Sequence, residues 1–357
     1  MSMRITRRFM IQTGFGATAM AAAYWMLDEA VYAESLQTPW PSITLVPPAQ
    51  SGSEKPPVIT AVAIHPNGPW VATAGDDHCV HVWDIAEQRL MFTLRGHTDW
   101  VQTIEFCPAK PVLASAGTDG RILLWDIKSG QRADDFASPT GPITRIAWSH
   151  DGVLLAVAGF SDRLRIYDPF ERSLVRELAC PGEDMRSVDF SPDDQHLAAG
   201  GRDGMVRVWT TADGQVFRDY NPHQRRIRGL AFSHENAHLV TSGEDRRIHV
   251  HSMVPGGEDF HLTGCAAKVL SLTFFGPHHL ATGCSDNSIR LWDLRSRSEI
   301  GQLRGHSGSV AALASRGSRL VSGSYDATVR IWTIADNIAQ ETPAEGTPAI
   351  RTSRIPK

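Results

Sequence analysis

The stretch that decides the fold is Gly117–Ile127, GTDGRILLWDI, in which a turn-forming start leads into an apolar run and a Trp-Asp pair. Related stretches occur six more times along the chain. Their anchor positions are Trp83, Trp125, Tyr167, Trp209, His251, Trp292 and Trp332, at successive spacings of 42, 42, 42, 42, 41 and 40 residues. Self-similarity at a period of about 40–45 residues predicts a β-propeller with one blade per repeat.

Each repeat contains four short segments that favour β-structure. In the second copy they are WVQTIEFCP, VLASAG, RILLWDI and RADDFA, which are rich in β-branched or aromatic residues or are framed by turn residues. A single four-stranded sheet cannot bury both of its faces, whereas radial stacking between two neighbours buries them. We therefore predict an all-β fold, a seven-bladed β-propeller of four-stranded antiparallel blades, over residues 34–335.

The two ends of the repeat region predict how the ring closes. The last copy stops at Ile334 without a convincing fourth strand, and the first copy begins near Val58 without an outer strand before it. The segment SITLVPP at Ser42–Pro48 is short and rich in β-formers, so we expect this N-terminal strand to become the outer strand of the seventh blade. Residues 336–357 are rich in Pro, Thr and charge, a composition typical of a disordered tail.

On these residues the chain resembles the WD-repeat β-propeller family from about Ser42 to Ile334. The dipeptides Gly96-His97 and Gly305-His306 match the family's Gly-His motif, and its Trp-Asp motif occurs in three copies. The family's turn aspartate, six residues before the anchor, is present in six copies, as Asp77, Asp119, Asp203, Asp245, Asp286 and Asp326.

Two copies depart from the family pattern. In copy three Ser161 stands at the aspartate position and Asp162 follows it, so we expect a turn one residue shorter than in the other blades. In copy five His251 replaces the aromatic anchor. These two blades should be the most irregular.

The resemblance also implies a buried polar relay in two blades, from carboxylate to imidazole to hydroxyl to indole. The residues are His97, Ser115, Asp119 and Trp125 in copy two, and His306, Ser322, Asp326 and Trp332 in copy seven. A Ser/His/Asp set also invites a hydrolase interpretation. Its recurrence at repeat spacing, and a sequence without a G-x-S-x-G nucleophile elbow, assign it to the fold instead.

Catalysis is the less favoured class of function. Outside the repeat positions the sequence shows no paired carboxylates, metal-ligand spacing or phosphate loop, so we expect no catalytic residues, no cofactor and no metal. An enzyme of this fold would instead have a central channel lined by ionisable pairs of perturbed pKa.

The net charge and the cysteines further limit which classes of function fit the sequence. The net charge of −4 argues against generic nucleic-acid binding. The five cysteines follow no paired spacing, so we expect no disulfide framework. Cys79, Cys107 and Cys284 fall on predicted strands and should be small core residues.

Residues 1–33 resemble a twin-arginine signal. Arg7-Arg8 precede an apolar stretch over residues 9–27, and Val31 and Ala33 suit a cleavage site. This pattern predicts export across a bacterial inner membrane, to the periplasm or an equivalent compartment. Two alternatives stay open. Residues 9–27 are long enough to remain as an uncleaved membrane anchor, at about 1.5 Å of rise per residue against a hydrocarbon core of about 30 Å, or the protein is cytosolic and the leader fortuitous.

The family's usual binding face carries the turns before the innermost strands and the turns with the aspartate. Aligning the copies divides that face into a cationic arc on blades four to six and a neutral, more aromatic arc on blades seven, one and two. The candidate binding residues are Arg186, Arg202, Arg226, Arg228 and Lys268 in the cationic arc, and Trp100 and Tyr325 in the neutral arc. Arg and exposed aromatic residues are enriched at binding hot spots.

The leading hypothesis is therefore a non-catalytic scaffold that docks a protein or peptide partner. The part of the partner that meets the arginines should be acidic. One alternative is a subunit of a multiprotein envelope assembly. A second is an enzyme with a site in the central channel. An ordinary charged surface without a shared ligand is the plain alternative to the cationic arc.

Overall fold

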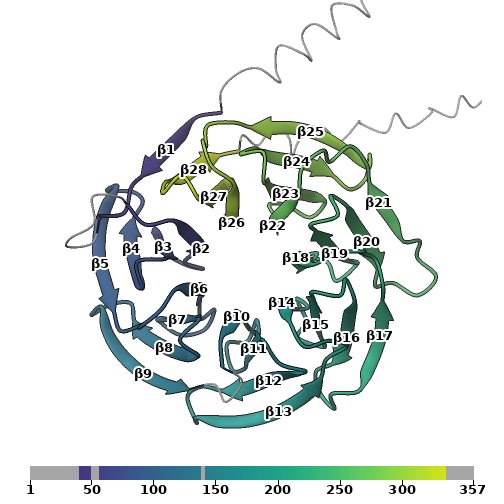
Figure 1. Ribbon diagram of the computed structural model, residues 1–357, viewed down its shortest axis with the longest axis horizontal. Coiled ribbons are helices and arrows are strands. Elements are labelled where there is room, and N and C mark those ends of the chain that lie inside the picture. Colours follow the sequence, from purple (N-terminus) through teal and green to yellow (C-terminus); the bar gives the residue numbers. More distant parts are fainter. Residues whose placement is uncertain (1–39, 50–55, 138–140, 335–357) are drawn as a thin grey trace, which may run out of the picture.

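The computed structural model describes residues 40–49, 56–137 and 141–334. Seven four-stranded antiparallel sheets are arranged as the blades of a closed ring around a central opening (Figure 1). This confirms the predicted seven-bladed propeller. The predicted signal segment 1–33 and tail 336–357 lie outside the described residues.

The strands follow the same order in every blade, from the opening outward. The innermost strands are β2 (Ile59–Ile64), β6 (Val101–Phe106), β10 (Ile143–Trp148), β14 (Met185–Phe190), β18 (Ile227–Phe232), β22 (Val269–Phe274) and β26 (Val310–Arg316). The second strands are β3 (Trp70–Gly75), β7 (Val112–Gly117), β11 (Leu155–Gly159), β15 (His196–Gly201), β19 (His238–Gly243), β23 (His279–Cys284) and β27 (Arg319–Ser324).

The third strands carry the anchor residues. They are β4 (Cys79–Asp84), β8 (Arg121–Asp126), β12 (Arg163–Asp168), β16 (Val206–Thr210), β20 (Ile248–Ser252), β24 (Ile289–Asp293) and β28 (Val329–Thr333). The outer strands are β5 (Arg89–Arg95), β9 (Gln131–Ala137), β13 (Ser173–Ala179), β17 (Val216–Tyr220), β21 (Phe260–Leu262), β25 (Ser298–Leu303) and, for blade seven, β1 (Ser42–Leu45).

The N-terminal strand closes the ring, as predicted. β1 pairs antiparallel with β28, with Ser42 opposite Trp332 and Leu45 opposite Val329. Leu45 is buried and packs with Val329 and with Ile59 of blade one. One short strand thereby completes the last blade and joins it to the first.

The core is divided among the gaps between blades. Each of the seven apolar clusters found among the described residues is built from two adjacent blades. In β8, Leu123 and Trp125 pack against blade one, while Ile122 and Leu124 pack against blade three. Because successive side chains of a strand point to opposite faces, a strand buried on both faces must be apolar throughout. This explains the apolar run in the repeat.

Both predicted polar relays are present. In blade two the His97 ring bonds Asp119 at 2.8 Å and Ser115 at 2.8 Å, and the Trp125 indole donates to the Ser115 hydroxyl at 2.8 Å. In blade seven His306 bonds Asp326 at 3.0 Å and Ser322 at 2.7 Å, and Trp332 donates to Ser322 at 2.9 Å. The three polar side chains of each set are buried or nearly so, as the structural interpretation requires.

Three further blades contain partial relays that the sequence analysis missed, and in blade six this is the Trp292 bond to Thr282 at 2.9 Å. In blade five His223 bonds Asp245 at 2.9 Å and Thr241 at 3.0 Å, but the chain of bonds ends there because His251 has replaced the indole. In blade one Trp83 donates to Thr73 at 3.1 Å. The imidazole there comes from His81 on β4 rather than from a Gly-His pair.

The prediction for the blade-three turn was wrong. Its turn is as long as that of blade two, with three residues between Gly159 and Arg163. The Ser161 hydroxyl accepts the Arg163 N–H at 3.1 Å, which is the bond that a turn aspartate makes in other blades. The aspartate has moved by one position without shortening the turn. Blade five is irregular as expected, since its outer strand β21 has only three residues.

The burial of the cysteines follows the prediction from the strand pattern. Cys79, Cys107 and Cys284 are buried, as predicted, and Cys180 and Cys265 are partly buried. Within the described ranges no helix is long and apolar enough to cross a bilayer.

Candidate binding face and central channel

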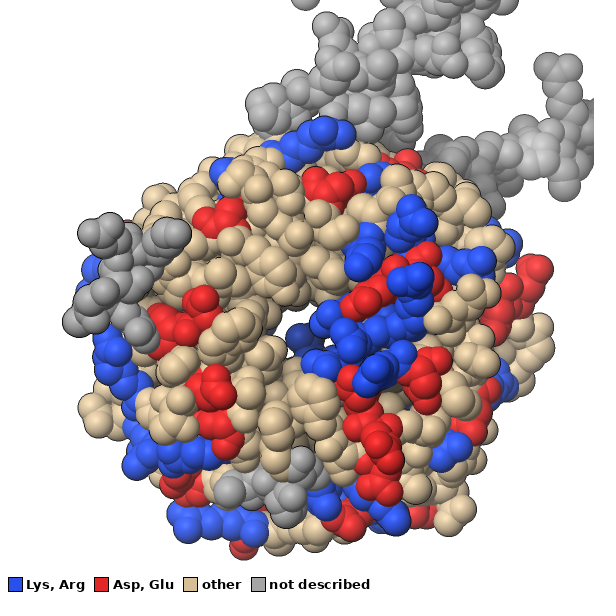
Figure 2. All heavy atoms as spheres, viewed as in Figure 1, with Lys and Arg blue, Asp and Glu red and all other residues tan. Residues whose placement is uncertain are grey.

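The face turned to the viewer in Figures 1 and 2, which we call the front face, is built from one repeated backbone contact. In each blade the residue after the end of the second strand donates its N–H to the carbonyl of the residue before the innermost strand. Examples are Arg202 to Asp184 at 2.9 Å and Tyr325 to Ser309 at 3.0 Å. The two segments approach so closely that a Cβ on Gly201 would lie 2.3 Å from the Asp184 carbonyl oxygen. Five of the seven blades have glycine at this position, whereas Cys284 and Ser324 stand there in blades six and seven.

This contact places two side chains per blade next to each other on the front face. Going round from blade one to blade seven, the pairs are Val58 and Asp76, Trp100 and Thr118, Pro142 and Phe160, Asp184 and Arg202, Arg226 and Glu244, Lys268 and Ser285, and Ser309 and Tyr325. The charged pairs fall in blades four, five and six. Figure 2 shows Lys and Arg gathered beside the opening over these blades, with acidic residues among them, while the opposite rim is mainly uncharged.

The arginines of this arc are joined through two carboxylates. Asp184 pairs with Arg186 and lies 3.8 Å from Arg226. Glu244 lies 3.4 Å from Arg226 and 2.8 Å from Arg228. The arc is thus an alternating network of three cations and two anions, and not a set of free charges. The network carries a surplus positive charge, and the exposed side chains of Lys268 and Arg202 stand beside it.

The electrostatics of Glu244 show how strongly the cations act. Burial raises its pKa, but the hydrogen bond from Arg228 and the charges of Arg228, Arg226 and Lys268 outweigh burial, so the pKa is lowered overall. A carboxylate of an incoming partner would meet the same field.

The structure brings most of the predicted binding residues together. Arg186, Arg228, Lys268 and Tyr325 line one hollow of about 340 Å³ at the front mouth of the opening. Arg202 lines an adjoining hollow with Asp184 and Phe160, and Arg226 lies within the ion-pair network. Trp100 is on the front rim and 49% exposed, but it does not line either hollow.

One residue of this face was missed by sequence reasoning. Phe160 is 48% exposed, and the Arg186 guanidinium lies over its ring at 4.4 Å from the centroid. The signal was its position directly after Gly159, the same position that Tyr325 and Arg202 occupy in their blades.

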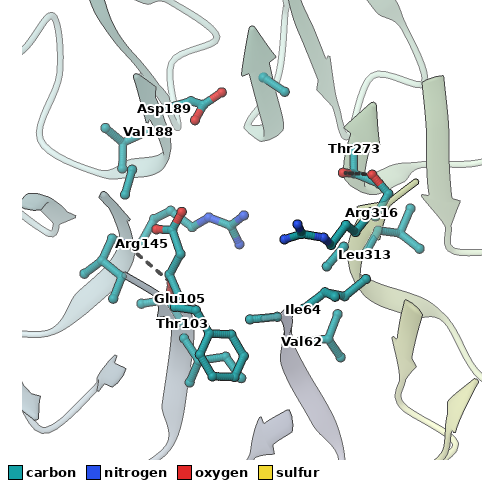
Figure 3. Close-up of a pocket in the computed structure, with 18 of the residues that line it drawn as sticks. Val62, Ile64, Thr103, Glu105, Arg145, Val188, Asp189, Thr273, Leu313 and Arg316 are labelled. Atoms are coloured by element: carbon teal, nitrogen blue, oxygen red, sulfur yellow. Dashed lines mark hydrogen bonds between the residues drawn. The ribbon is translucent and has the colours of Figure 1, made fainter. Parts of the chain in front are cut away.

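Behind the front hollow the channel continues into a second hollow of about 420 Å³. Arg145, Leu230, Leu272 and Leu313 line both, so the two hollows are halves of one passage through the ring. Figure 3 shows Arg145 and Arg316 reaching into this passage from opposite walls, with Glu105 and Asp189 on the wall near Arg145.

Two carboxyl groups that the sequence analysis did not single out line this passage, at equivalent positions of the repeat. Glu105 and Asp189 lie at the same position of β6 and β14, and each braces the next blade. Glu105 accepts the N–H of Trp148 at 3.0 Å, and Asp189 accepts the N–H of Phe232 at 2.9 Å. Burial raises the pKa of Glu105 to about 8 and that of Asp189 to about 6, with Arg145 opposing both shifts.

Blade six has an unusual pair of thiols. Cys265 occupies the place that His97 has in blade two, and Cys284 occupies the place of Gly117. The interaction between the two thiols lowers the pKa of Cys265 and raises that of Cys284. The turn aspartate Asp286, left without an imidazole, pairs with Arg290 at 2.9 Å.

The described residues contain no cluster of His, Cys, Asp or Glu that could hold a metal ion. The described fold is a closed seven-bladed ring whose front mouth is lined by charged and aromatic side chains.

The comparison with known families agrees with this architecture. The profile of the WD domain, G-beta repeat, matches residues 48–84, 88–126, 131–168, 172–210, 214–252, 258–293 and 297–333. The chain belongs to this family of WD40 repeats, whose propellers typically act as protein-interaction scaffolds and generally lack catalysis.

Individual relatives match only over short stretches. Mitochondrial division protein 1 from Mycosarcoma maydis is 37% identical over 84 residues, which is 23% of this chain and 10% of that protein. Cell division control protein 4 from Saccharomyces cerevisiae is 40% identical over 74 residues, 20% of this chain and 10% of that protein. The matches thus span about a tenth of the length of these curated relatives.

Proposed function

We propose that the protein is a non-catalytic interaction scaffold that docks an acidic segment of a partner protein on the cationic arc of its front face. The observation that carries this proposal is the ion-pair network of Arg186, Arg226 and Arg228 with two carboxylates. Lys268 and Arg202 add positive charge at its edge.

The network suits recognition for two reasons. The carboxylates hold the arginines in place, so little side-chain freedom remains to be lost when a partner binds. The surplus of positive charge attracts an acidic segment even though the whole chain has a net charge of −4. Exposed aromatic side chains, Phe160 beside the arc and Tyr325 across the mouth, offer apolar contact next to the charges.

The direct test is binding of a fluorescent peptide of alternating Glu and Leu, followed by anisotropy over a range of salt concentrations. The double variant Arg202→Glu with Lys268→Glu should weaken binding at least tenfold and flatten its salt dependence. These two positions are preferred to Arg228, because reversing Arg228 would place a carboxylate against Glu244 and disturb the fold.

A matched control comes from exposed arginines elsewhere. The double variant Arg132→Glu with Arg319→Glu makes the same change in net charge on the outer strand β9 and at the start of β27. It should leave affinity and salt dependence unchanged. Equal losses in the two double variants would show that only net charge matters and would remove support for a defined docking surface.

An enzyme with a site in the central channel is the second candidate, favoured by the perturbed pKa values of Glu105 and Asp189. Each of these carboxyls, however, uses one oxygen to hold the backbone of the next blade. That bond explains their positions without catalysis. Glu105→Gln and Asp189→Asn should therefore leave partner capture intact, whereas loss of a measurable turnover in both would favour the enzyme.

For location, we propose export through the twin-arginine leader, with an anchored form through residues 9–27 as the alternative. The support is the sequence pattern of residues 1–33. Arg7→Lys with Arg8→Lys should retain the protein in the cytoplasm. Mass spectrometry of the exported protein should show a start at Glu34 if the leader is cleaved, or an intact leader in the membrane fraction if it is not. Export that is indifferent to the arginine pair would contradict the proposal.

Membership of a stable envelope assembly differs from transient docking in one measurable respect. A permanent subunit co-migrates with its partners on native gels of gently lysed cells, whereas a transient scaffold migrates alone.

A further inference from the structure

The second hollow of the channel contains two guanidinium groups that the fold does not neutralise. Arg145 extends from β10 of blade three, and Arg316 extends from the end of β26 in blade seven, on the opposite wall (Figure 3). Within the described residues neither has a carboxylate within the 4.0 Å that defines an ion pair. Arg316 donates one hydrogen bond, to the His65 carbonyl at 3.2 Å.

The lining of the hollow is mixed, with uncharged wall segments between the charged groups. The described lining from β2, β18 and β22 is uncharged, and the hydroxyls of Thr273 and Ser315 are engaged with each other at 3.2 Å. Both arginine side chains are exposed to the passage, and two like charges that face each other across it repel. An anion between them would relieve this repulsion.

We propose that the central channel is a binding site for a small polyvalent oxyanion, such as phosphate, which Arg145 and Arg316 hold from opposite walls. A guanidinium group presents several N–H donors in a plane and pairs with oxyanions through two parallel hydrogen bonds. The hollow of about 420 Å³ accommodates an ion of this size with room for water. The site does not depend on the docking function of the front face.

The charge of the other channel groups supports this assignment. With a pKa of about 8, Glu105 is mainly protonated at pH 7, so it does not cancel Arg145. Asp189, with a pKa of about 6, is mainly ionised at that pH. His150 is paired with Asp194 at 3.1 Å, and burial together with the charge of Arg316 lowers the pKa of His65. Two arginines therefore face one carboxylate at neutral pH.

These protonation states give the site a pH dependence with a definite sign. As the pH falls through about 6, Asp189 takes up a proton and the net positive charge of the hollow rises. As the pH rises through about 8, Glu105 loses its proton and the positive charge declines. Affinity for an anion of constant charge should thus be highest near pH 5 and fall steadily toward pH 9.

The experiment is calorimetric titration of the folded chain with inorganic phosphate at pH 7, and with sulfate at several pH values because the charge of sulfate does not change there. We expect one phosphate per chain and an increase in melting temperature over chloride at equal ionic strength. Arg145→Gln and Arg316→Gln should each weaken binding at least tenfold, and Asp189→Asn should remove the change in sulfate affinity around pH 6. The Asn side chain keeps an oxygen for the Phe232 N–H.

Two controls separate this site from the surface. Arg319→Gln lies three residues from Arg316 but outside the hollow, and it should bind phosphate as the wild type does. The front-face variant Arg202→Glu with Lys268→Glu should also keep phosphate binding, so failure of the docking proposal is distinguishable from failure of this one. No saturable binding at millimolar phosphate, or equal binding by Arg145→Gln, Arg316→Gln and Arg319→Gln, would overturn the proposal.

Discussion

Ser42 and Trp332 stand opposite each other in the β1–β28 ladder, so the first and last strands of the described chain belong to one blade. Without β1, blade seven would end at β28 and would lack the fourth, outer strand that each of the other six blades has.

Deleting residues 34–48 should therefore lower the melting temperature sharply. The deletion removes the outer strand of blade seven and the buried Leu45, which packs against both blade seven and blade one. Thermal unfolding followed by circular dichroism measures the effect. Deletion of residues 340–357 is the control and should leave the melting temperature unchanged. Equal stability of the two deletion variants would contradict closure by β1.

Asp119→Ala and Asp326→Ala should each destabilise the fold by about 1–3 kcal/mol, because a buried imidazole loses its acceptor. Asp203 of blade four is a matched control. It occupies the same turn position but makes only a 3.4 Å bond to the Met205 N–H, so Asp203→Ala should cost less than about 0.5 kcal/mol. Urea denaturation gives the three values. Similar losses at all three positions would show that the turn, and not the relay, matters.

Stability should fall in two stages as the pH is lowered. Burial lowers the pKa of His306, so its unfolded form binds a proton first and stability declines below about pH 6.5. The pKa of Asp326 is lowered to about 2 despite burial, by bonds from Thr328, Ser307 and His306, so its contribution is complete above about pH 4 and lost toward pH 2. Denaturation midpoints against pH should show both limbs. Asp326→Asn should flatten the lower limb, and an unchanged lower limb would contradict this role.

Cys265 should be the most reactive thiol near neutral pH. The interaction with Cys284 lowers its pKa, and the thiolate is the reactive form. Cys284→Ala should raise that pKa and slow alkylation of Cys265 by iodoacetamide at pH 7 several-fold, as measured by peptide mass spectrometry. Cys180→Ala, in another blade, serves as the control and should have no effect. An unchanged rate in Cys284→Ala would show that the thiol contact does not control reactivity.

Features that repeat along the chain could be predicted from the sequence, and features that arise between blades could not. The period gave the number of blades, and the Gly-His and aspartate spacings gave the relays of His97 and His306. Glu105 is an ordinary polar residue in a strand until the ring places it beside the Trp148 N–H of the next blade. Cys265 and Cys284 are a different case, because both belong to blade six and follow no motif spacing. One replaces the relay histidine and the other the glycine at the end of the second strand.

The predicted binding residues show the same division. Alignment of the repeats placed Arg186, Arg228, Lys268 and Tyr325 at one mouth, where the structure has them. It could not show that Arg226 of blade five also reaches Asp184 of blade four and so joins the ion pairs of two blades into one network, because that contact runs between neighbouring blades.

The central claim is that the cationic arc of the front face docks an acidic segment. Photo-crosslinking of an acidic peptide that carries a benzophenone group, with the attachment sites mapped by mass spectrometry, tests this most directly. We expect crosslinks in the front turns of blades four to six, around residues 184–186, 202, 226–228 and 268, and their loss in Arg202→Glu with Lys268→Glu. Crosslinks spread over the outer strands, or concentrated on the opposite face of the ring, would contradict the claim.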